Sequence, residues 1–265
     1  MKVVTWNINS VRIRLQHLRD LLLEIDPDIV LLQEIKCETE HFPFDELSDL
    51  PYNFYVYGQK AYNGVAILSK LPANEVIKDL PPYTNIGQAR TLQISLQTPI
   101  GLCTFMSLYA PNGSFVGSDK FTAKLKFYDD LIHYLERQKS FESKLIIGGD
   151  FNIAPFDIDV YSATNLQDST CFTIPEKRQL RKILNSGFED LYRLSHPDKQ
   201  EFSWWDYRAG SFERNLGMRI DMILASSNAA DYLDSCEMHN SWRSKIKPSD
   251  HIPVIAKMIE FRPRS

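Results

Sequence analysis

This sequence lacks long apolar runs, and no apolar run in it approaches the ~18 residues that a membrane-spanning helix needs. The segment Met1–Asn9 turns polar before the apolar region of a signal peptide could form. Both absences argue against a membrane protein or a membrane partner. They predict a cytoplasmic location.

Cysteine is also scarce, and the four cysteines are far apart in the sequence. None belongs to a Cys-x-x-Cys pair or a Cys/His cluster, so neither a disulfide framework nor a zinc site is indicated. They are expected to be reduced and mostly structural. The four are Cys37, Cys103, Cys171 and Cys236.

An excess of positive charge is missing as well, because 30 Lys and Arg residues face 34 Asp and Glu residues, for a net charge of -4. Non-specific affinity for nucleic acid comes largely from Lys and Arg that neutralise phosphates. The balance therefore excludes an indiscriminate polyanion binder. Any nucleic-acid site must be a local patch that a bound cation assists.

No stretch rich in Gly, Ser or Pro offers a linker between domains. Hydrophobic residues make up 43% of the chain and charged residues 24%, which is ordinary for a globular protein with a sizeable core. We therefore expect residues 1–265 to form a single domain.

Helical periodicity is clear in three places. Leu15, Leu18, Leu21, Leu22 and Ile25 recur at helical spacing, and this helix is expected to be capped by Ser10 and closed by Pro27. A second amphipathic helix fits about 118–138 and leads into a strand that ends at Asp150. A third is expected to begin near Pro175 and to stop at Gly187.

Strand-like runs fill much of the remaining sequence. We expect antiparallel strands over 54–57, 65–68, 91–96 and 102–108, with turns at 63–64 and 99–101. The last third returns to strands around 203, 220 and 254. Mixed sheets with helices in both halves predict a layered α/β sandwich rather than a parallel doubly wound sheet.

Six apolar runs begin or end in a polar residue suited to metal or phosphate chemistry. Runs of this length, rich in Val and Ile, are typical of buried strands. Together their tips supply Asn, Glu, Tyr, Asp and His, and hard oxygen ligands with a histidine suit phosphodiester hydrolysis around Mg²⁺. The runs are Val3–Asn7, Ile29–Glu34, Phe105–Tyr109, Leu145–Asn152, Met218–Leu224 and Ser249–Ile255.

The tips differ in how strongly they indicate a site. Glu34 alone could be an exposed acid at a strand end, and Tyr109 alone could be a core residue. Asp150 and Asn152 are more informative, because residues i and i+2 point to the same side after two glycines. A structural turn remains the competing interpretation of that pair.

Asp221 and His251 are expected to form a pair. Alternation places Asp221 on the opposite face from Ile220 and Met222, and a carboxylate inside a strand needs a partner. An Asp that accepts from one ring nitrogen orients an imidazole and favours its cationic form. Taken alone, His251 would more often be an ordinary satisfied histidine, but the neighbouring Asp250 argues against that interpretation.

Aromatic residues and arginines are interleaved between residues 202 and 220. Such a mixture suits a surface that stacks on sugar or base and contacts phosphates, although a core hairpin with exposed arginines remains an alternative. The residues are Phe202, Trp204, Trp205, Tyr207, Arg208, Phe212, Arg214 and Arg219.

Seven short blocks together resemble the signature of the exonuclease III family of DNA-repair nucleases, in its order and spacing, from residue 1 to about 258. Versions of Glu34, GDFN and SDH also occur in the wider superfamily of deoxyribonuclease I, sphingomyelinases and inositol-phosphate phosphatases, whereas FSWWDYR with RID is typical of the DNA-repair branch. The blocks are WNIN at 6–9, LQE at 32–34, LYAPNG at 108–113, GGDFNIAP at 148–155, FSWWDYR at 202–208, RID at 219–221 and SDHIPV at 249–254.

The resemblance implies a deoxyribonuclease I-like fold, a four-layer α/β sandwich of two mixed β-sheets flanked by helices. It implies a monomer that needs Mg²⁺, with Mn²⁺ as a possible substitute. The substrate would be double-stranded DNA, cleaved 5′ to abasic sites and trimmed at 3′ ends or 3′-phosphates. Glu34 would be the principal metal ligand. The residues expected at or beside the metal are Glu34, Asn7, Asp250, Asp150, Asn152 and His251.

The resemblance also implies catalytic roles. Asp150 would position or deprotonate the attacking water, and Asn152 would bond a non-bridging phosphate oxygen. His251, oriented by Asp221, would stabilise charge on the phosphorane, and Tyr109 would lie near the phosphate or leaving group. The number of metal ions and the choice of Asp150 or His251 as the base stay open.

For DNA binding, the resemblance implies an apolar slot for a flipped-out abasic sugar, since flipping costs least where the base is missing. Phosphate contacts are expected from other residues, although Arg90 alone could be a solvated strand end. The sequence departs from many relatives at Asn9, where some members carry Asp, and in the loop 170–173 near the expected pocket. A bulky Phe172 at the pocket rim would bear on the balance of activities. The expected DNA-binding residues are Arg90, Asn112, Trp204, Arg208, Met218 and Ile220.

Three alternatives remain. The first is a 3′-end-trimming exonuclease or phosphatase that lacks abasic-site incision. The second is a superfamily phosphoesterase that acts on lipid or inositol phosphates, which the FSWWDYR block disfavours. The third is a non-catalytic DNA-binding scaffold, which predicts losses in a set of residues that are all present: Glu34, Asp150, Asn152, Asp221 and His251.

Overall fold

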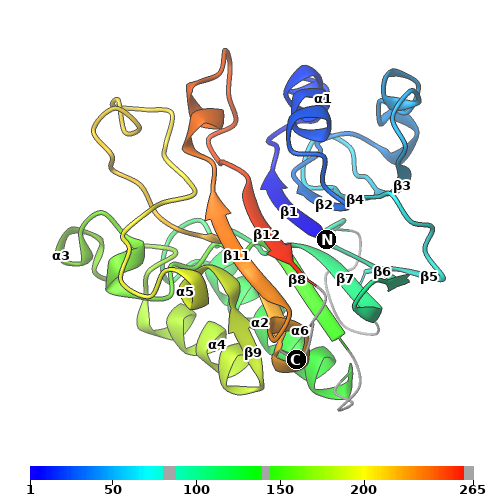
Figure 1. Cartoon of the computed structure of the whole chain (residues 1–265). Coiled ribbons are helices and arrows are strands. Elements are labelled where there is room, and N and C mark those ends of the chain that lie inside the picture. The colour runs from blue at the N-terminus through cyan, green and yellow to red at the C-terminus, as the bar shows by residue number, and fades with distance from the viewer. Residues whose placement is uncertain (80–87, 139–143, 260–265) are drawn as a thin grey trace.

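A computed structural model describes residues 1–79, 88–138 and 144–259, and the strands in these ranges form two six-stranded sheets (Figure 1). The first sheet has the order β11-β12-β1-β2-β4-β3 and the second the order β5-β6-β7-β8-β10-β9. The first sheet contains β1 (Lys2–Asn7), β2 (Ile29–Gln33), β3 (Asn53–Tyr57), β4 (Val65–Ser69), β11 (Leu233–Met238) and β12 (Val254–Met258). The second contains β5 (Glu75–Lys78), β6 (Thr91–Thr98), β7 (Gly101–Tyr109), β8 (Lys144–Asp150), β9 (Phe188–Asp190) and β10 (Asp221–Ser226).

Each sheet is mixed. β1 runs parallel to β2, and β7 runs parallel to β8, whereas the other pairings are antiparallel. Parallel neighbours need a crossover connection, and each crossover here contains one of the predicted helices. They are α1 (Leu15–Glu24) between β1 and β2, and α2 (Asp119–Gln138) between β7 and β8.

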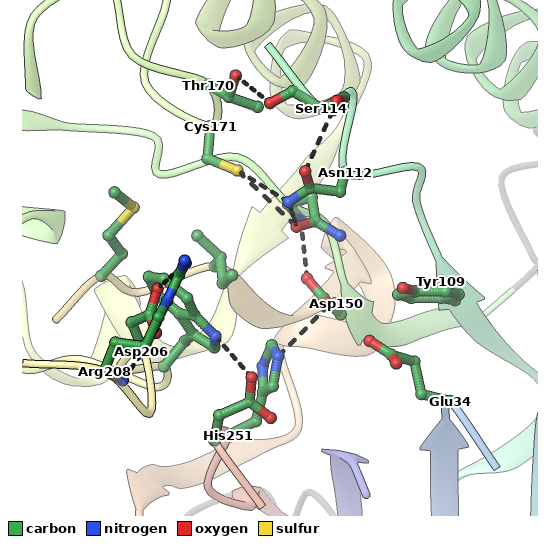
Figure 2. Close-up of a pocket in the computed structure, with 15 residues that line it drawn as sticks. Glu34, Tyr109, Asn112, Ser114, Asp150, Thr170, Cys171, Asp206, Arg208 and His251 are labelled. Carbon is green, nitrogen blue, oxygen red and sulfur yellow. Dashed lines mark hydrogen bonds and ion pairs between the residues drawn. The ribbon is translucent and has the colours of Figure 1, made fainter. Parts of the chain in front are cut away.

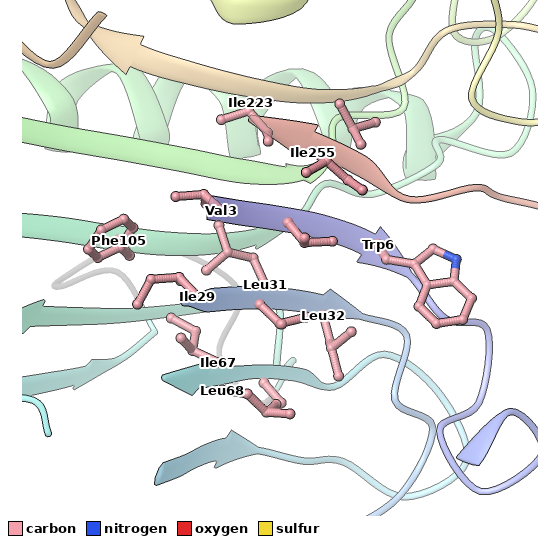
Figure 3. Close-up of a cluster of buried hydrophobic side chains, with 14 of the residues drawn as sticks. Val3, Trp6, Ile29, Leu31, Leu32, Ile67, Leu68, Phe105, Ile223 and Ile255 are labelled. Carbon is pink, nitrogen blue, oxygen red and sulfur yellow. The ribbon is translucent and has the colours of Figure 1, made fainter. Parts of the chain in front are cut away.

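The two sheets pack face to face over an apolar interior. Val3 and Leu31 from the first sheet and Phe105 and Ile223 from the second belong to one cluster of buried side chains (Figure 3). The sheets approach closely at Gly148, where a Cβ would lie 2.6 Å from Leu31 Cδ1. Glycine is therefore required at this position to let the layers meet.

Helices cover the outer faces of both sheets (Figure 1). α1 buries Leu18, Leu21 and Leu22 against the first sheet. α2 and α4 (Ile174–Asn185) lie on the second sheet, where Leu131 and Ile183 share a cluster with strand residues. The shorter helices are α3 (Ala163–Leu166), α5 (Leu191–Ser195) and α6 (Ser227–Ala230). The predicted four-layer α/β sandwich is confirmed.

Three local predictions were wrong. Ser10 does not cap α1, because it has φ +86 and its carbonyl accepts from the amide of Arg14 in a turn that precedes the helix. The segment around 203 is not a strand, because only Trp204 pairs there, in isolated bridges to Met218 and His251. His251 likewise precedes β12 by three residues instead of opening it.

The predictions for the other helices are confirmed within a few residues. α2 begins at Asp119, and α4 begins at Ile174 with Pro175 in its first turn. Thr173 accepts from the amide of Glu176, whose carboxylate accepts in return from the amide of Thr173, so the helix has a capping box. None of the described helices has the length and apolar character needed to cross a membrane.

Candidate active site

The ends of several strands meet at one edge of the two sheets. Asn7, Tyr109 and Asp150 are the last residues of β1, β7 and β8, and Glu34 directly follows β2. Because β7 and β8 are parallel, Tyr109 at the end of β7 lies opposite Asp150 at the end of β8. On the other side of β8, Asp150 lies opposite Asp221, the first residue of antiparallel β10. The strand order thus brings together polar residues that are up to 214 positions apart between Asn7 and Asp221.

The segment before β12 completes this edge. Val254 pairs with Thr5 in antiparallel register, so the residues that precede Val254 lie beside the end of β1. Trp6 Nε1 donates to the carbonyl of His251 at 3.1 Å, and Ser249 Oγ donates to the carbonyl of Asn7 at 2.7 Å. These bonds hold the Asp250-His251 dipeptide in place.

A cavity of about 450 Å³ opens over this edge (Figure 2). Polar residues line most of it, and one wall is apolar. A second cavity of about 600 Å³ adjoins it and shares Tyr109, Asn112 and Ser114. The first cavity is lined by Glu34, Tyr109, Asn112, Ser114, Asp150, Asn152, Thr170, Cys171, Trp204, Asp206, Arg208, Met218, Ile220, Asp250 and His251.

His251 lies between two carboxylates, as the sequence predicted for one of them. Its Nδ1 is 2.8 Å from Asp221 Oδ2, and its Nε2 is 3.7 Å from Asp150 Oδ2. Burial alone would lower the pKa of His251, but the charges of Asp221 and Asp150 outweigh burial and raise that pKa to about 10. The imidazole is therefore held as a cation at neutral pH.

Asp150 has the opposite character. Burial, together with the nearby charges of Asp221 and Glu34, raises the pKa of Asp150 to about 7, although the cation of His251 and a hydrogen bond from Asn7 oppose this rise. A carboxyl group with a pKa near neutrality is suited to accept a proton at the pH of the cell.

Asn7 and Ser203 orient these carboxylates from behind the cavity. Asn7 Nδ2 donates to Glu34 Oε1 and to Asp150 Oδ2, both at 2.9 Å, and Asn7 Oδ1 accepts from the amide of Asn9. Ser203 Oγ donates to Asp221 Oδ2 at 2.6 Å. The amide nitrogen of Asn7 therefore links Glu34 with Asp150, while its oxygen bonds to the backbone.

Two amide side chains, those of Asn112 and Asn152, also line the cavity. Asn112 Nδ2 donates to Asn152 Oδ1 at 3.1 Å, and Asn152 Nδ2 donates to the carbonyl of Ala110 at 2.9 Å. Behind them, the fully buried Lys124 donates to the carbonyls of Asn112 and Asn152 and forms an ion pair with Glu176. The two amides are consequently fixed relative to Asp150.

Tyr109 and Arg90 lie together where the two cavities meet. The guanidinium carbon of Arg90 is 4.9 Å from the centre of the Tyr109 ring, and Arg90 Nη1 donates to the carbonyl of Tyr109. Burial, followed by the charges of Glu34 and Asp150, raises the pKa of Tyr109 well above its ordinary value. Tyr109 therefore stays protonated and can donate a hydrogen bond.

The apolar wall is formed by Trp204, Met218 and Ile220, as the resemblance implied. Trp204 Nε1 donates to Asp250 Oδ2 at 3.1 Å, which fixes the ring beside the carboxylates. The expectation for Phe172 was wrong. Phe172 is buried behind the wall in the cluster of Met218 and Ile220, and its neighbour Cys171 faces the cavity instead.

Two arginines occupy different parts of the site. Arg208 lines the first cavity with a side chain that is 87% exposed and paired with Asp206 at 2.7 Å. Arg90 lines the adjoining cavity with Asn112. Arg219, by contrast, is fully buried and paired with Asp159 and Asp190, so it is not a surface cation.

The donors in this site fit a hard divalent cation. Ligand atoms of Glu34, Asp150 and His251 all lie within 4.8 Å of one another. Carboxylate oxygens are the preferred ligands of Mg²⁺ and Mn²⁺. A protonated His251 would act there as a neighbouring cation rather than as a ligand.

Sequence reasoning did not identify Lys36, Ser203 or the pair of Lys124 and Glu176. Ser203 had a visible signal, because it is a small polar residue inside the aromatic run FSWW. Lys36 had no such signal. Its contact with Glu34 depends on the left-handed backbone at both residues, which the sequence does not reveal. Lys124 reads as one of several helix cations, and only the packing of α2 on α4 buries it.

A four-layer sandwich that gathers carboxylates, an imidazole and amides at one sheet edge defines a hydrolytic phosphoesterase. The model of the Endonuclease/Exonuclease/phosphatase family matches residues 4–251 of the chain. The chain is 36% identical to exodeoxyribonuclease III of Haemophilus influenzae, over 97% of this chain and 99% of that protein. The chain therefore belongs to the endonuclease/exonuclease/phosphatase family of metal-dependent phosphoesterases and is a hydrolytic nuclease of the exonuclease III branch.

Solved structures agree with this assignment. A 3′ phosphatase from Neisseria bound to a product DNA hairpin has a TM-score of 0.94 and 33% identity, covering 98% of this chain and 100% of its own. An AP endonuclease from Archaeoglobus fulgidus has a TM-score of 0.92 and 34% identity, covering 97% of this chain and 99% of its own. The deoxyribonuclease I-like fold is thus confirmed.

Proposed function

We propose that this nuclease hydrolyses DNA phosphodiesters with Mg²⁺, or with Mn²⁺ as a substitute, incising 5′ to abasic sites and removing 3′ nucleotides or 3′-phosphates. The observation that carries this proposal is the pairing of Asp150 and His251. Their pKa values are raised to about 7 and about 10, and they face one cavity whose other wall is apolar. A base and a cation side by side are what attack of water on a phosphate requires.

In this proposal Asp150 is the general base and His251 is not. Asp150 Oδ1 accepts from the amide of Asn152 and Oδ2 from Asn7, so the carboxylate is fixed in orientation and aimed at the cavity. As a cation, His251 carries a proton on each ring nitrogen. Nδ1 faces Asp221, and Nε2 would donate to a phosphate oxygen as charge develops.

Other residues of the two cavities are proposed to bind the phosphate and the divalent cation. Asn152 is proposed to bond a non-bridging phosphate oxygen, and the protonated Tyr109 to lie near the leaving group. Glu34 would hold the divalent cation, with Asp250 close by as a further carboxylate, and the bound cation would neutralise charge on the phosphate. Arg90 and Asn112, in the adjoining cavity, would contact the phosphates of the neighbouring nucleotides.

The apolar wall supports recognition of an abasic sugar. Trp204, Met218 and Ile220 give one side of the cavity an apolar surface, and the indole nitrogen of Trp204 is already bonded to Asp250. Extrusion of a nucleotide costs least where the base is already missing, so such a slot favours damaged over intact sites.

One observation favours the 3′-trimming alternative. Cys171 has a left-handed backbone with φ +76, and this conformation turns its side chain into the cavity, where Sγ lies 3.8 Å from Asn152 Oδ1. The side chain takes up room next to the proposed phosphate donor. A 3′-terminal phosphate needs less of the slot than an extruded sugar within a continuous strand.

The activity is expected to follow a bell-shaped pH profile. kcat/KM should rise as Asp150 loses its proton and fall as His251 loses its own. Asp221 raises the pKa of both groups, so Asp221→Asn should move both limbs of the profile to lower pH. Initial rates on an abasic duplex between pH 5 and pH 11, about the span of these pKa values, measure this shift. An unchanged alkaline limb would show that Asp221 does not control the proton of His251.

Trp204→Ala is expected to weaken selection of abasic sites more than chemistry. The substitution removes one wall of the slot and the hydrogen bond to Asp250, but it leaves Asp150 and His251 in place. The ratio of kcat/KM on abasic duplex to kcat/KM on an intact recessed 3′ end should fall by about tenfold, the equivalent of one lost apolar wall. An equal loss on both substrates would remove Trp204 from the selectivity assignment.

The function itself is tested with three substrates in Mg²⁺ and in EDTA. These are a duplex with one internal abasic analogue, a duplex with a recessed 3′-phosphate, and a set of inositol phosphates and sphingomyelin. Cleavage 5′ to the abasic site supports the full proposal. Release of phosphate from the 3′ end alone favours the trimming alternative, and hydrolysis of the third set alone would overturn the DNA assignment. The monomeric state and the cytoplasmic location stay predictions.

A further inference from the structure

Three residues beside the proposed metal site have a left-handed backbone. Asn9, Glu34 and Lys36 have φ values of 47, 49 and 52. This conformation costs a non-glycine residue about 1 kcal/mol or more, and it persists only where surrounding contacts enforce it. The amide of Ser10 donates to the carbonyl of Glu34 at 2.7 Å, and the amide of Lys36 donates to the carbonyl of Asn63 at 3.0 Å. The local fold thus imposes this arrangement.

The two left-handed residues turn the side chains of Glu34 and Lys36 toward each other. Lys36 Nζ lies 2.8 Å from Glu34 Oε2 and donates to Asn9 Oδ1 at 2.5 Å. Asn7 Nδ2 donates to the other carboxylate oxygen of Glu34. Both oxygens of the proposed metal ligand are therefore already engaged, one of them by a full positive charge.

Asn9 extends this contact to the second carboxylate. Its Nδ2 donates to Asp250 Oδ1 at 2.8 Å, while its Oδ1 accepts from Lys36. An ammonium only donates and an ionised carboxylate only accepts, so the orientation of the amide is determined by its partners. One ammonium and one neutral amide thereby link Glu34 with Asp250.

We propose that Lys36 is an internal counter-cation of the metal site, which neutralises Glu34 in the metal-free protein and competes with the divalent cation for that carboxylate. Lys36 would then set the metal affinity of this nuclease. The inference rests on the proposed function in one respect, that the cation binds at Glu34.

Charge repulsion is the reason to expect competition rather than assistance. An ammonium in hydrogen-bond contact with the ligand oxygen lies within a few ångströms of any cation that binds there, and like charges at that separation repel by more than the thermal energy at the dielectric constants of protein surfaces. Asn9 adds no negative charge to offset this repulsion, since its side chain is a neutral amide. The cation must displace Lys36 or share Glu34 with it.

Binding of Mn²⁺ alone, without DNA, tests the inference. Mn²⁺ titrations are followed by the water-proton relaxation rate for the wild-type chain and for Lys36→Met, which keeps an apolar side chain of similar length without the charge. Lys36→Met is expected to bind Mn²⁺ about fivefold more tightly or better. Thermal melting checks that the variant is folded, and Glu34 should keep its hydrogen bond from Asn7.

Lys70→Met is the matched control. Lys70 Nζ also pairs with a carboxylate, Asp26 Oδ1 at 2.6 Å, but Lys70 follows the end of β4 that pairs with Ile29 at the start of β2, away from the site. Its substitution should leave Mn²⁺ affinity unchanged. Glu34→Gln locates the binding, because it should abolish the Mn²⁺ signal.

The outcomes separate this inference from the proposed function. Unchanged affinity in Lys36→Met would overturn it, and weaker affinity would mean that Lys36 holds Glu34 in its binding position. In either case wild-type binding that depends on Glu34 leaves the proposed function standing. Absence of Glu34-dependent Mn²⁺ binding in the wild-type chain would overturn both.

Discussion

Replacing Asp150 by asparagine is expected to reduce kcat on DNA by about 10³-fold or more, because the carboxamide cannot take the proton of the attacking water. The variant keeps the shape of the side chain, so KM for DNA should change little. Asp150 Oδ1 and Oδ2 accept from Asn152 and Asn7, and the new amide can keep one of these two bonds. The measurement is single-turnover cleavage of an abasic duplex.

The same substitution should not unfold the protein. The folded state raises the pKa of Asp150 from 3.8 to about 7, chiefly by burial, so the folded protein binds this proton more tightly than the unfolded chain. The ionised carboxylate therefore lowers stability progressively as the pH rises from about 4 to 7. Asp150→Asn removes that penalty, and its thermal midpoint at pH 8 should be unchanged or higher. A large drop in the thermal midpoint would contradict the account, because the loss of activity could then result from unfolding.

Removal of His251 is expected to have the next largest effect. His251→Ala should reduce kcat by about 10²- to 10³-fold, the range seen when a preorganised donor to a developing anion is lost. His251 lines the cavity with its Nε2 3.7 Å from Asp150 Oδ2, so its loss removes a cation from beside the proposed base. Rates on the abasic duplex at saturating metal measure this effect.

His251→Ala also leaves Asp221 buried without its cation, and this must be separated from catalysis. Asp221 is 1% exposed, and Ser203 Oγ would still donate to its Oδ2. The double variant Asp221→Asn/His251→Ala removes the unpaired charge and should recover stability but not activity. Recovery of kcat in the double variant would show that the single variant failed through folding, and His251 would lose its assigned role.

The stability contributed by His251 has its own pH dependence. Its pKa is raised from 6.5 to about 10, so its favourable charge is fully present below about 6.5 and is lost as the pH rises toward 10. The stability gap between wild type and the double variant should therefore narrow on going from neutral to alkaline pH.

The sequence alone predicted the layers and the strand edge of this site. Apolar runs such as Leu145–Asn152 mark strands by composition, and the helix between two parallel strands brings their carboxyl ends to one edge. Glu34, Asp150 and Tyr109 could therefore be grouped before the structure was known. The resemblance supplied the apolar wall, which lies where it was expected apart from Phe172.

Other features depend on tertiary contacts that leave no local pattern. The left-handed turns at Asn9, Glu34 and Lys36 are imposed by bonds to neighbouring segments, so their consequence for Glu34 could not be foreseen. Serine is a residue type that often caps helices, but the amide of Ser10 donates to the carbonyl of Glu34, and α1 begins only at Leu15. Trp204 looks like a strand residue and is held instead by single bridges from both sides.

The central claim is that this sheet edge hydrolyses a DNA phosphodiester with a divalent cation and with Asp150 as the base. Its most direct test is incision of a duplex with one abasic analogue by wild-type protein in Mg²⁺, beside wild type in EDTA and Asp150→Asn in Mg²⁺. The account predicts a single cut 5′ to the abasic site in the first reaction and almost none in the other two. Cleavage that persists in EDTA, or in folded Asp150→Asn at the wild-type rate, would contradict it.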